Sequence, residues 1–160
     1  MSNTNPLLTP HQMGALHLPN RVLMAAMTRN RADEGAVPAE LAITYYRQRA
    51  SAGLVFTEAS QVHPTGTGYI GTPGCYNEAQ TESWRKIVEA VHAAGGRIFL
   101  QLWHVGRVSD PELQPDGGQP IAPSAIQGDG FVFAPSGFKP MAEPRAMTQA
   151  DIDEMIAAFR

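Results

Sequence analysis

Residues 97–107 read RIFLQLWHVGR, an apolar run that ends in polar and aromatic side chains and then a glycine. Near-continuous apolar runs of this length are typical of parallel strands that are covered on both faces. Gln101 interrupts the run, and a buried amide costs free energy unless its donors and acceptor find partners. Gln101 therefore either bonds to the backbone or points toward a ligand, and the second alternative places a site at the end of a strand.

Two apolar runs earlier in the chain, residues 21–27 and 54–59, predict further strands. A helical pattern follows each of them, over residues 39–51 and over residues 77–94, with apolar side chains recurring near one face. Gly53 is expected to end the first helix in a left-handed conformation. The predicted order is thus strand, helix, strand, helix, strand.

This alternation requires right-handed crossovers and a parallel sheet, which leaves two architectures. A doubly wound nucleotide domain usually has a glycine-rich turn after its first strand, but residues 27–38 contain only Gly35. The strand centres near Leu23, Val55 and Phe99 advance by roughly the 30 residues of a (β/α)8 unit once the long loops are allowed for. We expect an α/β fold of the (β/α)8 TIM-barrel class, with only the first three or so β/α units present.

Two segments lie outside the alternation. Residues 1–20 are expected to form a cap or small hairpin, and residues 105–147, rich in proline and glycine, an excursion or lid after the third strand. A last helix begins at Thr148, which is followed three residues later by Asp151 as a capping pair, and it ends on an apolar stripe without a stop signal. Residues 1–160 are therefore expected to be the amino-terminal part of a single TIM-barrel domain, with the carboxyl-terminal part absent or on another chain.

Composition limits the partners. The 160 residues are 43% hydrophobic and 17% charged, as in ordinary globular proteins, and a net charge of -3 supplies no basic surface for nucleic acid or anionic membranes. The single cysteine, Cys75, cannot form an internal disulfide, and no Cys/His cluster has zinc-ligand spacing. The chain also shows no secretory signal and no run near the ~20 apolar residues of a membrane span. We expect a cytoplasmic protein with small-molecule partners and no metal.

In a barrel of this class the site forms at the carboxyl ends of the strands. Thr28 follows the first predicted strand, Ala59 ends the second, and Gln101 to Trp103 end the third. A hydroxyl, a backbone amide beside a small side chain and a primary amide together suit a flat heterocycle with polar edges. The alternative is structural: Thr28 caps a turn, Ala59 is small for packing, and Trp103 is a packed aromatic side chain.

Several separated motifs resemble the Old Yellow Enzyme family of FMN-dependent ene-reductases. The resemblance covers nearly the whole chain, and the order and spacing of the motifs make it specific. The motifs are Leu18–Val22 leading to Ala25–Arg29, Thr57–Ala59, Gly68–Tyr69 with Thr72–Gly74, His92–Gly96, Gln101–Arg107 and Pro144–Thr148. The family usually carries a proline where Ala26 stands, a departure expected to alter loop rigidity more than chemistry.

The resemblance implies the residues that bind the cofactor. The backbone around Ala26 and Met27 would lie against the FMN, and the Thr28 hydroxyl would bond to the O4 edge of the isoalloxazine and tune its redox poise. Ala59 and Gln101 match positions that hold the O4 and pyrimidine edges of the flavin. Thr28 is accordingly the predicted catalytic residue.

The resemblance also implies the reaction. Tyr69 and Trp103 match positions that line the substrate pocket, whereas His104 does not match the family's proton donor and is expected to pack or hydrogen-bond. The implied enzyme uses NADPH or NADH to reduce FMN and then reduces activated C=C bonds of unsaturated carbonyl or nitro compounds. The groups that bind the substrate carbonyl, donate the proton and hold the FMN phosphate come later in the family's barrel. This chain is therefore expected to need a complementary carboxyl-terminal segment and to be inactive alone.

The sequence allows two alternative functions. A stand-alone, non-catalytic half-barrel for binding or assembly is one, although three parallel strands cannot close a barrel and their open edges would invite association. A dihydroorotate-type flavin barrel is the other, and it would need lysine- and asparagine-rich flavin contacts that the sequence lacks.

Overall fold

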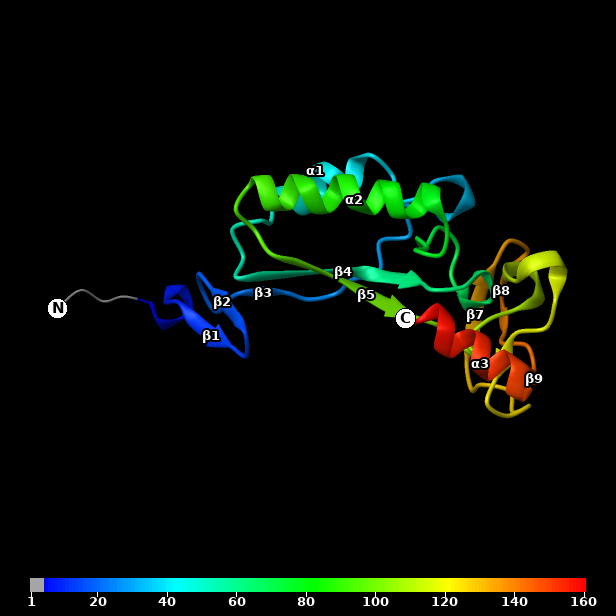
Figure 1. Cartoon of the computed structure of the whole chain (residues 1–160). Coiled ribbons are helices and arrows are strands. Elements are labelled where there is room, and N and C mark those ends of the chain that lie inside the picture. The colour runs from blue at the N-terminus through cyan, green and yellow to red at the C-terminus, as the bar shows by residue number, and fades with distance from the viewer. Residues whose placement is uncertain (1–4) are drawn as a thin grey trace.

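The centre of the molecule is a three-stranded parallel sheet in a computed structural model that describes residues 5–160. Its strands are β3 (Leu23–Met24), β4 (Leu54–Gln61) and β5 (Ile98–Trp103), and they lie in chain order (Figure 1). The first four residues of the expected cap, 1–4, fall outside the described residues.

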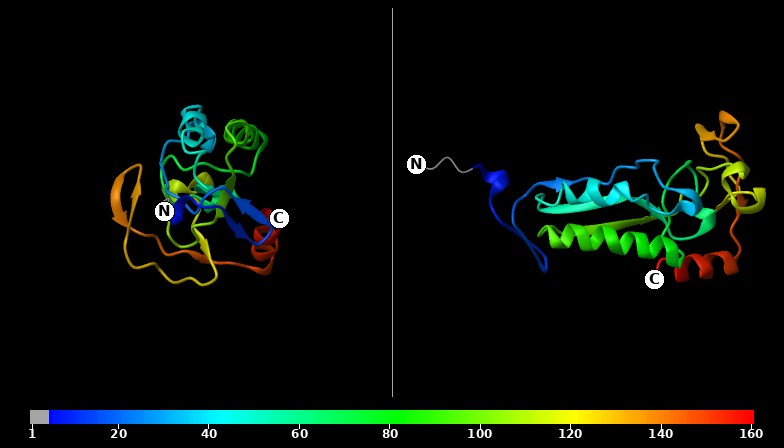
Figure 2. Two further views of the ribbon diagram at one scale, coloured as in Figure 1. Left: turned by 90° about the vertical axis from the view of Figure 1, so that its left-hand side faces the viewer. Right: turned by 90° about the horizontal axis from the view of Figure 1, so that it is seen from above.

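Both crossover helices cover the same face of this sheet. Helix α1 (Leu41–Arg47) follows β3 and helix α2 (Glu78–Ala93) follows β4, and the two pack side by side above the strands (Figures 1 and 2). A doubly wound sheet carries helices on both faces and reverses its strand order, whereas a barrel wall does neither. The arrangement therefore favours a section of barrel wall, and the described residues do not close a barrel.

Apolar side chains from α1, α2 and the sheet form the core between the layers. The buried cluster consists of Tyr46, Ala50, Val55, Trp84, Ile87, Val91 and Ile98. Helix α2 presents its stripe inward as its spacing predicts, and Asn77 caps it by accepting a hydrogen bond from the Gln80 N–H at 2.9 Å. Each large apolar side chain buried in this way contributes about 1.5–3 kcal/mol.

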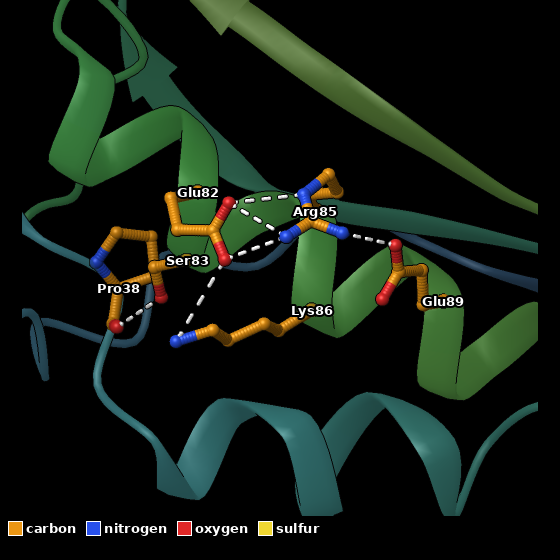
Figure 3. A network of polar contacts seen from close by, with 6 residues as sticks. All are labelled: Pro38, Glu82, Ser83, Arg85, Lys86 and Glu89. Atoms are coloured by element: carbon orange, nitrogen blue, oxygen red, sulfur yellow. Dashed lines mark hydrogen bonds and ion pairs between the residues drawn. The ribbon is translucent and has the colours of Figure 1, made fainter.

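The opposite side of α2 carries a charged network (Figure 3). Arg85 bonds to Glu82 with N–O distances from 2.7 Å and also pairs with Glu89 one turn on, while Lys86 lies 3.9 Å from Glu82. These are i,i+3 and i,i+4 pairs on an exposed surface, where each ion pair contributes little to stability. The network identifies this as the outer surface of the helix layer.

Two local predictions were wrong. The first strand was expected over residues 21–27, but β3 contains two residues because its pairing with β4 stops at Met24 and Val55. Gly53 was expected to adopt a left-handed conformation, but its φ is not positive. A Cβ there would lie 2.2 Å from the Asn20 carbonyl oxygen, so glycine is required by the close approach of the two backbones.

The remaining elements lie at the two ends of the strands. Strands β1 (His11–Met13) and β2 (Leu16–Leu18) form an antiparallel hairpin at the amino ends, within residues 1–20, where a cap or small hairpin was expected. The excursion lies at the carboxyl ends (Figure 2). It contains β6 (Ile121–Ala122), β7 (Phe131–Ala134), β8 (Gly137–Pro140) and β9 (Arg145–Ala146), in pairs β6–β9 and β7–β8. Short 3-10 helices occur at Pro6–Leu8, Glu34–Ala36, Pro64–Gly66, Pro111–Leu113 and Pro115–Gly117.

Helix α3 (Gln149–Ala158) follows the excursion. Thr148 and Asp151 form the capping box that the sequence predicted, each bonding to the backbone N–H of the other. The end of α3 returns toward β5, where Phe159 and Leu102 line a common cavity of about 300 Å³. In the part of the chain described here, no helix has the length and apolar character needed to cross a bilayer.

Candidate active site

A β-bulge offsets the carboxyl halves of β4 and β5. Phe56 pairs with Phe99, but the next pair is Ala59 with Gln101, so β4 has two residues where β5 has one. Side chains alternate between the two faces of a strand, and an extra residue inverts the alternation. Ala59 therefore shares a face with Phe56 and lies directly beside Gln101. The structure thus brings together two of the predicted flavin-binding positions.

Hydrogen bonds from outside the ladder hold the bulge. The Gln101 N–H donates to the Thr57 hydroxyl oxygen at 3.1 Å, and the Thr57 hydroxyl donates to the Glu58 carbonyl at 2.8 Å. The Glu58 N–H donates to the Tyr46 hydroxyl oxygen at 2.8 Å. Burial raises the pKa of the Tyr46 phenol, which keeps it a neutral partner. A tyrosine of α1 therefore fixes the backbone directly before Ala59.

The segment that carries Thr28 reaches the site from the edge of the sheet. Ala26 is half-buried, Met27 is 48% exposed, and Thr28 is exposed without a hydrogen bond to its hydroxyl among residues 5–160. The Arg29 N–H donates to the Glu58 carboxylate at 3.0 Å. Thr28 is thereby linked to the same bulge that places Ala59, and its hydroxyl is available to a ligand.

Tyr69 and Trp103 form an aromatic stack beside these residues. Their ring centroids lie 5.7 Å apart with an interplanar angle of 14°. Tyr69 is 39% exposed, and the Trp103 indole N–H is buried without a hydrogen-bond partner within residues 5–160. Buried indole N–H groups usually find a partner, so this donor is suited to a bound polar group. The stack supplies one flat wall at the end of β5.

Gln61 organises the long loop between β4 and α2. Its side chain is fully buried, and its amide donates to the hydroxyl oxygens of Thr67 and Thr72 at 3.1 and 3.0 Å. The Gln114 amide of the excursion donates to the Thr67 carbonyl at 2.7 Å. Loop and excursion are therefore joined through buried polar contacts rather than through an apolar core.

A chain of hydrogen bonds also links two histidines to α3. His104 Nδ1 accepts from the Gly106 N–H at 3.0 Å, so its Nε2 carries the proton toward the Thr65 hydroxyl, 3.1 Å away. Thr65 then donates to His63 Nδ1 at 2.8 Å, and His63 Nε2 lies 3.3 Å from Glu154. Burial, aided by the charge of His63, lowers the pKa of His104. His104 serves here as a neutral hydrogen-bonding group, as expected from the sequence.

Three residues of the site were missed or had no argued role in the sequence. Glu58 was named only as part of the Thr57–Ala59 motif, while Tyr46 and Gln61 were not singled out. A phenol within an apolar helical stripe and a glutamine that continues a buried strand are the signals that could have drawn attention to them. Cys75 is half-buried and donates to the Gln61 carbonyl at 3.4 Å, with its pKa raised by burial, which is a packing role. Within the described residues, no group of three or more His, Cys, Asp or Glu could hold a metal ion.

Comparisons with known proteins identify relatives for almost the whole chain. The profile of the NADH:flavin oxidoreductase / NADH oxidase family matches residues 6–160. The chain is 44% identical over 160 residues to putative 12-oxophytodienoate reductase 4 of Oryza sativa subsp. japonica, covering 97% of this chain and 40% of that protein. It is 49% identical over 167 residues to putative 12-oxophytodienoate reductase 11 of the same organism, covering 100% of this chain and 44% of the other.

Solved structures show the same likeness in three dimensions. Morphinone reductase in complex with tetrahydroNAD matches with a TM-score of 0.89 and 49% identity, over 97% of this chain and 44% of that one. The old yellow enzyme homologue from Zymomonas mobilis matches with a TM-score of 0.90 and 41% identity, over 97% and 43%. The described fold is therefore that of a part of such a barrel. The chain spans less than half of the length of each of these relatives.

Proposed function

Because the chain belongs to the NADH:flavin oxidoreductase / NADH oxidase family, we propose that it forms the amino-terminal part of an FMN-dependent ene-reductase. The cofactors are FMN and NADPH or NADH as its reductant. The proposed substrates are activated alkenes, namely α,β-unsaturated carbonyl or nitro compounds. The cytoplasmic location expected from the sequence stays a prediction.

The pairing of Ala59 with Gln101 is the observation that carries this proposal. It sets a small side chain and an exposed primary amide side by side at the carboxyl end of the sheet, with the Thr28 hydroxyl linked to the same bulge. Amides and hydroxyls make directional hydrogen bonds without introducing charge, as the polar edge of an isoalloxazine requires. The alternative roles of Thr28 as a turn cap and of Ala59 in packing alone leave the exposed Gln101 amide unexplained.

The residues present fit FMN in three respects. The side chain of Ala59 is small, the Thr28 hydroxyl has no partner among residues 5–160, and the buried Trp103 N–H lacks an acceptor there. When bound, FMN would take up a hydride from the nicotinamide and pass a hydride to the β-carbon of the alkene. Gln101 and the backbone at Ala59 would hold its pyrimidine and O4 edges.

The other roles follow from what each side chain offers. Thr28 would donate its hydroxyl to the O4 edge and so stabilise added electron density there. The parallel rings of Tyr69 and Trp103 would limit the orientations of a flat substrate over the cofactor. His104, engaged at both ring nitrogens, would hold the loop after β5 in place rather than transfer a proton.

We further propose that residues 1–160 form part of a single barrel domain whose remaining strands come from a complementary segment, on the same chain or a second one. The face of the sheet away from α1 and α2 supports this. Leu23 and Phe99 are each more than 40% exposed, and neither edge strand is paired on its outer side within residues 5–160. Apolar faces and unpaired edges of this kind are normally covered. The completed protein is this chain together with that segment.

A visible spectrum and an anaerobic titration test the function. The completed protein is expected to show the bands of oxidised flavin and to bleach when NADPH or NADH is added without oxygen. Gln101→Ala is expected to raise the FMN dissociation constant about tenfold, because two hydrogen bonds to a buried ligand edge are lost. Gln119→Ala, an exposed glutamine of the excursion, serves as the matched control and should leave FMN binding unchanged.

Either of two results would contradict the proposal. Completed protein that is colourless and takes up no added FMN would rule out the flavin enzyme and favour a non-catalytic half-barrel. Yellow protein in which Gln101→Ala and Gln119→Ala bind FMN equally well would show that the cofactor lies elsewhere.

A further inference from the structure

Glu58 is a buried carboxylate at the candidate site, and the proposed function assigns no role to it. It is 7% exposed, and burial raises its pKa, while the Arg29 N–H and the Arg29 charge act in the opposite direction. Placing a carboxylate in such surroundings costs free energy unless hydrogen bonds compensate. The partners of Glu58 therefore indicate what the residue is for.

The first partner is the Arg29 backbone. After the pair of Met24 and Val55, residues 25–28 make no further ladder pairing with β4 in the part of the chain that the structure describes. The segment next meets β4 where the Arg29 N–H donates to Glu58 Oε2 at 3.0 Å. Thr28 is the residue directly before this hydrogen bond, so its position depends on it.

The second partner holds Glu58 itself. Its backbone N–H is fixed by the Tyr46 hydroxyl at 2.8 Å, and Tyr46 is fully buried in the helix layer. The Arg29 guanidinium packs 3.7 Å from the centre of the Tyr45 ring, next to Tyr46 on α1. Glu58 therefore connects a rigid point in the core to an otherwise unpaired segment, one residue before Ala59.

We propose that Glu58 is a positioning residue for the flavin: its carboxylate accepts the Arg29 N–H and thereby fixes the Thr28 hydroxyl relative to Ala59 and Gln101. This inference rests on the proposed function. Glu58 does not touch the cofactor, and it acts through Thr28.

Two substitutions separate this role from a direct effect of the negative charge. Glu58→Gln keeps an acceptor oxygen within reach of the Arg29 N–H but removes the charge. Glu58→Asp keeps the charge but shortens the side chain by one C–C bond, about 1.5 Å, which takes the oxygen out of hydrogen-bond range. The side chain borders a cavity of about 400 Å³ between residues 29–32 and α1, so both replacements can be accommodated.

The readouts are the midpoint potential and the visible spectrum of FMN bound to the completed protein. Glu58→Gln is expected to match the wild type in both. Glu58→Asp is expected to shift the potential and to raise the FMN dissociation constant about tenfold, the effect of losing one hydrogen bond to a charged group. Glu82→Gln, on the exposed network of Figure 3, is the matched control and should change neither.

A double-mutant cycle with Thr28→Ala tests the route of the effect. If Glu58 acts through Thr28, Glu58→Asp shifts the potential of the wild type but not that of Thr28→Ala. Equal shifts in both backgrounds would overturn the inference. A shift of the potential in Glu58→Gln relative to the wild type would also overturn it, and this outcome can be read even if Glu58→Asp fails to fold. Wild-type protein that binds no FMN would instead overturn the proposed function.

Discussion

The helix-covered face of the sheet and the carboxyl ends of its strands are built on different principles. The covered face is an apolar core in which Val55 and Ile98 pack against Ile87 and Val91. The carboxyl ends contain buried polar groups, among them Glu58, that are held by directional hydrogen bonds. Apolar packing depends mainly on the volume of the side chains and tolerates changes in their shape. A hydrogen bond instead requires a particular donor and acceptor at a particular distance and angle. The first region should therefore respond to lost volume and the second to lost donors or acceptors.

The largest effect is expected in the apolar core. Ile87→Ala removes a fully buried side chain and should lower the free energy of unfolding of the completed protein by about 2–5 kcal/mol. Ile87→Val, which keeps most of the volume, should cost about 0.5–1.5 kcal/mol. Denaturant unfolding measures both. Equal losses for the two variants would break the comparison, because volume would not be what this face responds to.

The next effect is expected where the excursion meets the long loop. A Cβ on Gly68 would lie 2.2 Å from the Val108 carbonyl oxygen, so Gly68→Ala must push the two segments apart. An overpacked site of this kind costs about 1–3 kcal/mol. Hydrogen exchange should accelerate in residues 62–76 and 105–114 but not in α2, and uniform acceleration in α2 as well would show that the two regions unfold as one.

A substitution of equal size sharpens the contrast. Gln61→Leu keeps the volume of a fully buried side chain but removes the donors to Thr67 and Thr72. We expect the free energy of unfolding to fall by about 1–2 kcal/mol, because these buried hydrogen bonds are lost. A volume-conserving change in the apolar core would be nearly neutral by comparison. Thermal unfolding is the measurement, with Ile87→Leu as the matched core variant. A smaller loss for Gln61→Leu than for Ile87→Leu would contradict the comparison.

A pH-dependent effect should be confined to the carboxyl ends. His104 has a pKa below its ordinary value of 6.5 because it is buried, so the unfolded chain binds its proton first as the pH falls. Its contribution to stability is complete above pH 6.5 and decreases as the pH falls from there toward the lowered pKa. Unfolding of the wild type and of His104→Gln at pH 7.5 and pH 5 should show their stabilities converging at the lower pH. A constant difference would show that His104 does not titrate in this window.

The smallest effect is expected on the outer surface of α2. Glu82→Gln breaks two exposed ion pairs, and the low pKa of Glu82 reflects its hydrogen bonds to Arg85 in a fully solvated setting. We expect no measurable change in the unfolding temperature. A clear fall in the unfolding temperature would show that this network stabilises the helix layer.

The sequence predicted the elements better than their ends. The 97–107 run gave a strand that the structure places at Ile98–Trp103, and the Thr148–Asp151 pair gave the helix cap that is observed. Both signals are local, since each depends on residues a few positions apart. The length of β3 and the role of Gly53 depend on neighbours that are distant in sequence, and both predictions were wrong for that reason.

In the candidate site too, some residues could be predicted from local sequence patterns and others could not. Gln101 and Trp103 could be selected because an amide and an indole at the end of an apolar run are unusual there. The residues that pair or hydrogen-bond with them could not be predicted, because strand register and side-chain contacts are properties of the folded chain. Nothing in Thr57-Glu58 marks a bulge, and no sequence pattern links Glu58 to the Arg29 N–H. The roles of the site residues stay predictions until FMN binding is measured.

The bulge in β4 also has a consequence for recombining such barrels by gene shuffling. Because the pairs Phe56–Phe99 and Ala59–Gln101 enclose two residues of β4 and one of β5, a crossover before Phe56 or after Ala59 keeps the bulge intact, whereas one between them can lose the extra residue. Loss of a single codon between Phe56 and Ala59 would leave Ala59 opposite Gln101 in a regular ladder. It would remove either the Thr57 hydroxyl that binds the Gln101 N–H or the Glu58 carboxylate that binds the Arg29 N–H, while leaving the composition of the strand almost unchanged.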